Sequence, residues 1–376
     1  MNIIINTSNL YVGGGLQVAL SFINELKELN KHYQYHVFLS IAVSDQIDED
    51  SFSDNFHFYL IKKSPASLKT RKAILRKLDT LETLIKPDIV FTVFGPSYWK
   101  PKTKHLMGFA IPWLINPQSS AFTQLPLLKR LIVRAKLLYQ KKYIREYADY
   151  YVVESLDTKN KLSSVLDISN HKIEVIGNTV SKLYFEKEFS NFTMPEKMDD
   201  EVRFITISHN YAHKNLKIIN KLIPYIEKIE IPIRFFVTID KQSYKTLFNG
   251  LEKYVLNLGP VQAIDCPSIY QQSDVMFLPT LLECFSASYP EAMKMELPIL
   301  TSNYSFATDI CGDAALYFDP LDPKDIMDKI QMLIKDKKLR IDLVEKGKKR
   351  LEKFETSRSR AEKYLLLCKS IVKEEI

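Results

Sequence analysis

The stretch PTLLECFSASYPEAMK, residues 279–294, decides how the fold is interpreted. It begins at the end of the apolar run VMFLPT (275–280), which is typical of a buried strand. A short loop follows with two serines that can cap a helix, Ser286 and Ser288, and Pro290 suits the first turn of that helix. A strand that passes through a short loop into a helix is the repeating unit of a parallel α/β sheet.

This stretch carries two carboxylates, Glu283 in the loop and Glu291 in the first helical turn. Their spacing means little by itself, because 45 of the 376 residues are acidic. Their position means more, since a helix N-terminus presents backbone N–H groups that suit a diphosphate. Glu291 can accept hydrogen bonds from a ribose diol, and Glu283 would project toward the group that the diphosphate carries. The alternative is a plain helix start, with Glu291 favoured by the helix dipole and Glu283 solvated.

Strand and helix patterns alternate along the rest of the chain. The first half shows apolar strand patterns at IIIN (3–6), YQYHVFLS (33–40), PDIVFTVF (87–94), HLMGFAI (105–111) and DYYVVES (149–155), and it ends with IEVIGNTV (173–180). The second half shows them at VRFITIS (202–208), IPIRFFVTI (231–239), VMFLPT (275–280), LPILTS (297–302) and AALYF (314–318). The sequence therefore predicts the α/β class, with two Rossmann-like parallel-sheet domains that face a central cleft. The expected domains are an N-terminal one over 1–185 and a C-terminal one over 186–355. The last helical patterns cover roughly 323–334 and 338–372. The end of the chain, over 356–376, is expected to be a helix that crosses back to the first domain.

Composition argues against a secreted protein, a protein with a membrane-spanning helix and a protein built on disulfides or zinc. The N-terminus lacks the basic start and long apolar stretch of a secretory signal, and no run of about 18 apolar residues occurs. The four cysteines form no CxxC pair, which fits a reducing cytoplasm. Residues 1–180 hold 23 Lys and Arg against 16 Asp and Glu, which is the whole net charge of +7. That half is expected to prefer an anionic partner.

Two further segments suit phosphate binding. In ITISHNYAHKNL (205–216), Lys214 opens the first helix of the second domain and is a compact cation. In the first domain, Gly13, Gly14 and Gly15 follow the first strand and permit a close backbone approach to a ligand. The plainer alternatives are a surface lysine and an ordinary tight turn.

The motif ECFSASYPEAM, followed by LPILTSN and GDAALYFDPLDP, resembles the donor-site signature of retaining GT-B glycosyltransferases of family 4, the glycosyl transferases group 1. The resemblance covers about residues 202–350 well and the first half loosely. It implies that Glu283 contacts the donor sugar and that Glu291 binds the nucleotide ribose. It also implies that backbone N–H groups hold the sugar and phosphate, from Phe285, Ser286, Ala287 and Ser288.

The resemblance assigns further roles. Lys214 matches the family's phosphate-binding lysine, so Lys214 and Glu283 are the expected catalytic residues. His209 stands where the family usually has arginine, which is a departure, although histidine can also donate to a phosphate. Val261 matches the loop that contacts the base through backbone atoms, and Asn178 matches an asparagine at the domain junction. The loop with Gly14 and Gly15 matches one that faces the donor phosphate or the acceptor.

The segment 93–113 lacks an expected feature of the family, a histidine directly after an apolar strand. His105 precedes its strand, so no catalytic histidine is assigned. Four residues of this segment are expected to line the acceptor side, unless they are ordinary loop and core residues: Gly95, Ser97, Phe109 and Trp113.

The helix predicted over 125–145 has a basic side, formed by Arg130, Arg134, Lys141 and Arg145. Its other side is apolar, with Leu127, Leu128, Leu131, Ile132, Ala135 and Leu138. A basic amphipathic helix suits an anionic membrane surface. A solvated basic face on a domain surface is the alternative. Nucleic acid is not an expected partner, because no reader motif is present.

The resulting expectation is a retaining hexosyltransferase. It moves a sugar from a nucleoside diphosphate sugar to a hydroxyl acceptor, such as a growing or lipid-linked surface glycan. No metal cofactor is expected, and the location is the cytoplasm or the inner face of the membrane. A GT-B sugar-nucleotide epimerase, a non-catalytic nucleotide-sugar or sugar-binding protein and an inactive transferase remain as alternatives.

Overall fold

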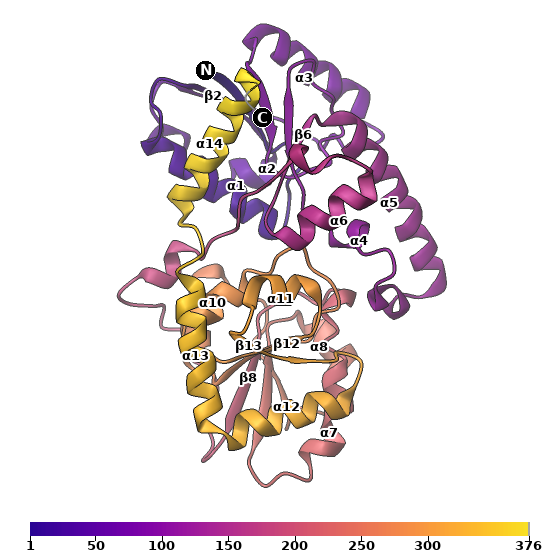
Figure 1. Ribbon diagram of the computed structural model, residues 1–376, viewed down its shortest axis with the longest axis vertical. Helices are drawn as coiled ribbons and strands as arrows, with labels where there is room; N and C mark the ends of the chain where they lie inside the picture. The colour runs from indigo at the N-terminus through magenta and orange to yellow at the C-terminus, as the bar shows by residue number, and fades with distance from the viewer. Residues whose placement is uncertain (375–376) are drawn as a thin grey trace. The chain divides into compact units, whose positions relative to one another are not determined.

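The computed structural model describes residues 1–374, which form two compact units (Figure 1). The first unit contains Met1–Ile115, Leu131–Asn178 and the chain from Glu355 onward. The second contains Asn116–Arg130 and Thr179–Phe354. The units therefore meet at 178/179 and 354/355, where the sequence suggested 185/186 and 355/356, and the second unit also takes a short segment from the first half of the chain.

The first unit is built on a seven-stranded parallel sheet in the order β3-β2-β1-β4-β5-β6-β7. The chain moves outward from β1 on one side and then returns to begin at β4 on the other. The β1–β4 boundary is thus the switch point of a doubly wound sheet, where such sheets bind ligands. The strands are β1 (Asn2–Asn6), β2 (Gln34–Leu39), β3 (Phe56–Leu60), β4 (Ile89–Thr92), β5 (His105–Gly108), β6 (Tyr150–Val153) and β7 (Ile173–Val175).

The last helix, α14 (Ser357–Lys373), belongs to the core of the first unit. It packs against α1 (Gly14–Glu25), and both lie beside each other in Figure 1. The Tyr364 ring lies edge-on to Phe22 at 5.2 Å between centroids and 5.2 Å from Phe91. The other longer helices of this unit are α3 (Arg71–Ile85), α5 (Leu127–Tyr147), whose first turn lies in the second unit, and α6 (Leu156–Leu166).

The second unit has a six-stranded parallel sheet in the order β10-β9-β8-β11-β12-β13. Its switch point lies between β8 and β11. The strands are β8 (Val202–Thr206), β9 (Ile233–Val237), β10 (Val255–Asn257), β11 (Val275–Leu278), β12 (Ile299–Ser302) and β13 (Ala315–Phe318). The helices are α7 (Ile218–Ile226), α8 (Lys241–Phe248), α9 (Cys266–Gln271), α10 (Ser288–Lys294), α11 (Ser305–Cys311), α12 (Pro323–Lys335) and α13 (Lys337–Leu351).

Two predicted helices differ from the structure for local reasons. The helix expected from residue 214 begins at Ile218, because Asn215 adopts a left-handed conformation (φ 55°) that ends a 3-10 turn over Ala212–Lys214. The helix expected over 338–372 is two helices, α13 and α14. The second starts afresh at Thr356, whose side chain accepts a hydrogen bond from the Ser359 N–H.

Candidate active site

Two loops meet at the switch point of the second sheet. One follows β8 and contains His213, and the other follows β11 and contains Thr280 and Leu281. The backbone carbonyl of His213 accepts hydrogen bonds from the Leu281 N–H at 2.7 Å and from the Thr280 hydroxyl at 3.2 Å. The loops are therefore fixed to each other at the edge of the sheet where doubly wound folds bind ligands.

Lys214 and Glu283 form an ion pair at this junction. The Lys214 Nζ lies 2.6 Å from Glu283 Oε1, and their side chains are only 13% and 10% exposed. The Thr280 hydroxyl donates to the same carboxylate oxygen at 3.1 Å. Both contacts use Oε1, so Oε2 can accept a hydrogen bond from a ligand hydroxyl. Lys214 likewise has three N–H donors, of which this pair uses one.

The loop after β8 also carries a row of three rings. The exposed His209 ring lies 5.7 Å from Tyr211, and Tyr211 stacks on His213 at 5.6 Å with only 9° between the planes. Burial lowers the pKa of His213 to about 4; the charge of Glu283 acts against this effect and that of Lys214 adds to it. His213 is therefore neutral near pH 7, and its backbone rather than its charge organises the loops.

Glu291 lies in α10, on the helix that leaves the β11 loop. Burial raises the pKa of its carboxyl group to about 7, while the nearby hydroxyls of Tyr184 and Tyr270 act in the opposite direction. Tyr184 and Tyr270 are themselves buried, with ring centroids 6.1 Å apart. Neither tyrosine was expected from the sequence, because no local pattern shows that Tyr184 and Tyr270 pack beside Glu291. A carboxylate held beside two phenols suits a ligand with two hydroxyl groups.

The start of α10 differs from the expected capped helix. The N-cap is Ala287, which has no side chain able to accept a hydrogen bond, and neither Ser286 nor Ser288 caps the first turn. Ser286 is buried instead, and Ser288 is the first helical residue. The Phe285 ring packs against Phe354 at 6.3 Å, so that its side chain belongs to the core of this unit.

A segment from the first half of the chain lies against these loops. The second unit contains Asn116–Arg130, and the Ser119 hydroxyl donates to the Leu281 carbonyl at 3.2 Å. The hydroxyls of Ser120 and Tyr304 lie 3.4 Å apart. The sequence assigned this segment to the first domain, because no local pattern shows which sheet a connecting segment joins.

Two other predicted donor residues, Asn178 and Val261, lie in different units. Asn178 is in the first unit, where its side chain accepts a hydrogen bond from the buried Arg360 guanidinium and bonds to Glu154. Arg360 also donates to the Ser21 hydroxyl at 2.9 Å. Asn178 is therefore part of a polar cluster of the first unit, at the boundary with the second, and its assignment to the donor stays a prediction. Val261 is half-buried and packs with its side chain on the core of the second unit.

The glycine turn follows β1, at the switch point of the first sheet. Gly13 is the N-cap of α1, with φ 80° and ψ −166°, a conformation that essentially only glycine adopts. Gly14 is exposed, and a Cβ there would meet no atom within 4 Å. At Gly15 a Cβ would lie 3.1 Å from the Phe94 ring. Only Gly13 is needed for the backbone geometry, and Gly14 leaves room for a ligand.

The segment 93–113 is mostly internal. Ser97 and Phe109 are buried, and Ser97 donates to the Trp99 carbonyl at 2.5 Å. A Cβ at Gly95 would lie 2.2 Å from the Met107 sulfur. The expectation that Ser97 and Phe109 line an acceptor site is therefore wrong, because they fill the interior of the first unit, whereas Gly95 is partly exposed. Trp113 is half-buried in the short helix α4 (Pro112–Ile115).

His105 is a structural residue of the sheet. It begins β5 and is fully buried, with its Nε2 2.8 Å from the Thr92 hydroxyl and its Nδ1 at the Tyr147 carbonyl. Burial lowers the pKa of its ring to about 4. The sequence analysis assigned His105 no catalytic role. In the structure both ring nitrogens are occupied by contacts within the first unit, to Thr92 and Tyr147.

The helix α5 exposes its apolar side. Leu137 and Ile144 are buried, whereas five large apolar side chains are 59–74% exposed, namely Leu127, Leu128, Leu131, Ile132 and Leu138. Cationic residues are interspersed among them, including the exposed Lys129, Arg134 and Lys136. An amphipathic helix normally buries its apolar side against its own domain, and α5 does not.

Residues 1–374 contain no group of three or more His, Cys, Asp and Glu side chains placed to hold a metal ion. None of the helices in this range combines the length and the apolarity needed to span a bilayer.

A comparison with models of protein families finds a match in the second unit. Residues 189–350 match the model of the family described as glycosyl transferases group 1. A stretch of 87 residues is 34% identical to the capsular polysaccharide biosynthesis glycosyltransferase CapM of Staphylococcus aureus, and it covers 23% of either chain. The chain thus spans about a quarter of the length of this relative.

Solved structures extend the similarity to both units. A glycosyltransferase from Rickettsia africae superposes with a TM-score of 0.73 and 16% identity, over 99% of this chain and 98% of the other. HepE of Anabaena, in complex with UDP and glucose, gives a TM-score of 0.70 and 14% identity, over 98% of this chain and 100% of the other. At such identities the similarity concerns the fold. The family match therefore concerns residues 189–350 of the second unit, and the solved structures show that the two Rossmann-like units have the GT-B fold of glycosyltransferases.

Proposed function

We propose that this chain transfers a sugar from a nucleoside diphosphate sugar to a hydroxyl group of a glycan acceptor. The observation that carries the proposal is the pair Lys214–Glu283 at the switch point of the second sheet, 2.6 Å apart and largely buried. Glu291 follows in the helix that leaves the same loop. A cation and two carboxylates are thereby available where doubly wound sheets bind nucleotides.

Each of these residues has a chemical role in the proposed reaction. Lys214 directs its remaining N–H donors to the diphosphate, whose negative charge grows as the glycosidic bond breaks. His209 and the backbone N–H groups of residues 285–288 add donors for the same charge. Glu283 accepts a hydrogen bond from a sugar hydroxyl through Oε2. Glu291 accepts the two ribose hydroxyls, and the backbone at Val261 contacts the base.

The remaining features of the reaction come from the family. The sugar is transferred with retention of configuration, by front-face attack without a protein nucleophile and without a metal cofactor. The first unit binds the acceptor, with Gly14 and Gly15 close to the ligand. The structure of HepE with UDP and glucose and the capsular function of CapM support a nucleotide-sugar donor and a surface-glycan acceptor.

The exposed side of α5 points to a lipid-linked acceptor. Five apolar side chains exposed beside lysines and arginines suit the interface of an anionic membrane, where the apolar groups enter the acyl boundary and the cations meet headgroups. We propose that α5 docks the chain peripherally on the inner face of the membrane, where a lipid-linked glycan can reach it.

A panel of UDP-, GDP- and ADP-sugars tests the donor proposal. At least one should raise the melting temperature of the chain and release its nucleoside diphosphate. The variant Glu291→Gln should keep the melting temperature of the unliganded protein within a few degrees but lose most of the stabilisation by that donor. If no nucleotide sugar stabilises the wild-type chain, the proposed function is wrong.

A further inference from the structure

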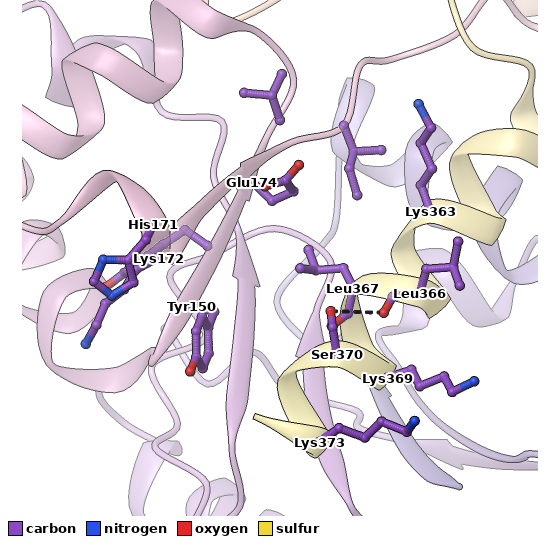
Figure 2. A pocket seen from close by; sticks show the side chains of 13 residues that line it. Tyr150, His171, Lys172, Glu174, Lys363, Leu366, Leu367, Lys369, Ser370 and Lys373 are labelled. Atoms are coloured by element: carbon purple, nitrogen blue, oxygen red, sulfur yellow. Dashed lines mark hydrogen bonds between the residues drawn. The ribbon is translucent and has the colours of Figure 1, made fainter. Parts of the chain in front are cut away.

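A hollow of about 620 Å³ lies in the first unit between α14 and the strands β6 and β7 (Figure 2). β7 is the last strand of its sheet, and α14 packs on α1 and β4, further in. The sheet surface near β7 and the side of α14 therefore form two walls of an open site. Its volume lies within the range of about 300–1,000 Å³ that is typical of small-molecule sites. It lies in a different unit from Lys214, Glu283 and Glu291.

The lining of this hollow is strongly cationic. Lys172 stands just before β7, and Lys363, Lys369 and Lys373 lie along α14. Figure 2 shows His171 and Lys172 on one side of the hollow and the three α14 lysines on the other. Among the described residues 1–374, Glu174 is the one carboxylate in its lining. Such an excess of positive charge attracts negatively charged ligands into the hollow.

Two of these lysines can bind a ligand without losing an ion pair. Lys363 is already paired with Glu355. Lys172 and Lys369 are exposed and form no ion pair with any residue of the range 1–374. They come from opposite walls, one from the β7 side and one from α14, so an anionic ligand that bridges the hollow can contact both.

The other lining residues favour a sugar over a simple phosphate. The ring of Tyr150 and the exposed side chain of Leu366 offer apolar surface against which a sugar ring can lie. Glu174 and Tyr150 lie between the two cationic walls in Figure 2. A carboxylate in this place repels a compact phosphate cluster, but it accepts hydrogen bonds from hydroxyl groups.

We propose that this hollow binds an acidic oligosaccharide. Lys172 and Lys369 contact its acidic groups, Tyr150 and Leu366 contact the faces of its sugar rings, and Glu174 accepts hydrogen bonds from its hydroxyls. The choice of a glycan among polyanions rests on the proposed function. A chain held at a second site has a raised effective concentration, so the hollow keeps the growing glycan on the enzyme between transfers.

Calorimetric titration of the full chain with hexagalacturonate at low salt tests this site, with the neutral maltohexaose as the matched sugar. The acidic hexamer should bind, and its affinity should fall as salt is raised. The double variant Lys172→Ala/Lys369→Ala should weaken binding at least tenfold. The control Lys337→Ala/Lys338→Ala removes the same charge from exposed lysines of the second unit and should change the affinity less than twofold.

Three results would overturn the proposal. The control variant could lose as much affinity as the double variant, or maltohexaose could bind as well as the acidic hexamer. Single-stranded DNA or phosphatidylglycerol vesicles could instead bind more tightly through Lys172 and Lys369. UDP binding measured on the same proteins distinguishes a failure of this proposal from a failure of the donor proposal. The double variant Lys172→Ala/Lys369→Ala should bind UDP like the wild type.

Discussion

Lys214 Nζ lies 2.6 Å from Glu283 Oε1, although the two residues belong to different loops of the second unit. The pair joins the loop after β8 to the loop after β11, the strands on either side of the switch point. It therefore holds both loops in place and sets a cation beside a carboxylate where the donor is proposed to bind.

The first prediction concerns this pair. Lys214→Met leaves the Glu283 carboxylate largely buried without its partner, so the free energy of unfolding should fall by about 3 kcal/mol. Adding Glu283→Gln should restore part of the loss, with a coupling energy of about 1–3 kcal/mol in urea unfolding. Sugar transfer should fall about 100-fold or more in each single variant. The exposed Lys217, mutated to Met, is the matched control and should leave both quantities near the wild type. If the stability losses of the two single variants simply add up in the double variant, the Lys214 and Glu283 side chains do not interact.

The second prediction concerns the pH dependence of nucleotide binding. The pKa of Glu291 is raised to about 7 by burial. The ribose diol needs the ionised carboxylate as acceptor, so UDP affinity should rise up to tenfold per pH unit below 7 and level off above it. Glu291→Gln should flatten this profile. Tyr184→Phe removes a hydroxyl that lowers this pKa, so it should move the midpoint to higher pH. A profile that Glu291→Gln leaves unchanged would contradict the ribose assignment.

Local patterns were sufficient for the architecture. Apolar strands such as Ile3–Ile5 and Val275–Leu278 are buried on both faces, so they stand out as continuous apolar runs. The edge strand β3 and the short strand β10 were missed, since β3 is half exposed and β10 has only three residues. The short helices α6, α8 and α11 were also missed, because a few turns give little periodicity.

The candidate site was only partly predictable. The sequence singled out Glu283, Glu291 and Lys214 because loops and helix starts have recognisable local patterns, and the structure pairs Lys214 with Glu283. Their donor roles stay predictions. Tyr184 and Tyr270 were not singled out, since they approach Glu291 through tertiary packing. The segment with Ser119 was missed for the same reason. The partner of Asn178 was not predicted, because a sequence match does not show that Arg360, 182 positions away, donates a hydrogen bond to its side chain.

The third prediction compares two neighbouring glycines. Gly13→Ala forces a side chain into a conformation with φ 80° and ψ −166°, so it should lower the free energy of unfolding by about 1–3 kcal/mol. Gly14→Ala meets no atom and should leave stability within about 0.5 kcal/mol of the wild type. If a ligand approaches the backbone there, Gly14→Ala should still raise the KM for donor or acceptor. Unchanged kinetics for Gly14→Ala would remove this turn from the site.

The fourth prediction concerns Glu154 in the cluster with Arg360. Burial raises the pKa of Glu154 from 4.5 to about 7, despite the opposing effects of Arg360 and Asn178. A carboxyl group whose pKa is higher in the folded state stabilises the fold below its unfolded pKa and loses this contribution as pH rises toward 7. Glu154→Gln should therefore make the slope of unfolding free energy between pH 4.5 and 7 more positive, by up to about 1.4 kcal/mol per pH unit. Equal slopes in both proteins would show that Glu154 ionises normally in the fold.

The last prediction concerns the exposed apolar side of α5. Leu128→Gln/Leu131→Gln removes two side chains that are 72% and 64% exposed, so it should not lower the melting temperature by more than a few degrees. It should reduce binding to vesicles with phosphatidylglycerol by tenfold or more, because each buried leucine contributes about 1.5–3 kcal/mol to transfer from water. The matched control Leu321→Gln removes an exposed apolar side chain of the second unit and should bind vesicles like the wild type. Transfer to a short water-soluble acceptor should stay the same in all three proteins, whereas transfer to a lipid-linked acceptor in vesicles should fall only in the α5 variant. Vesicle binding that survives the loss of both leucines would show that α5 does not dock the chain on the membrane.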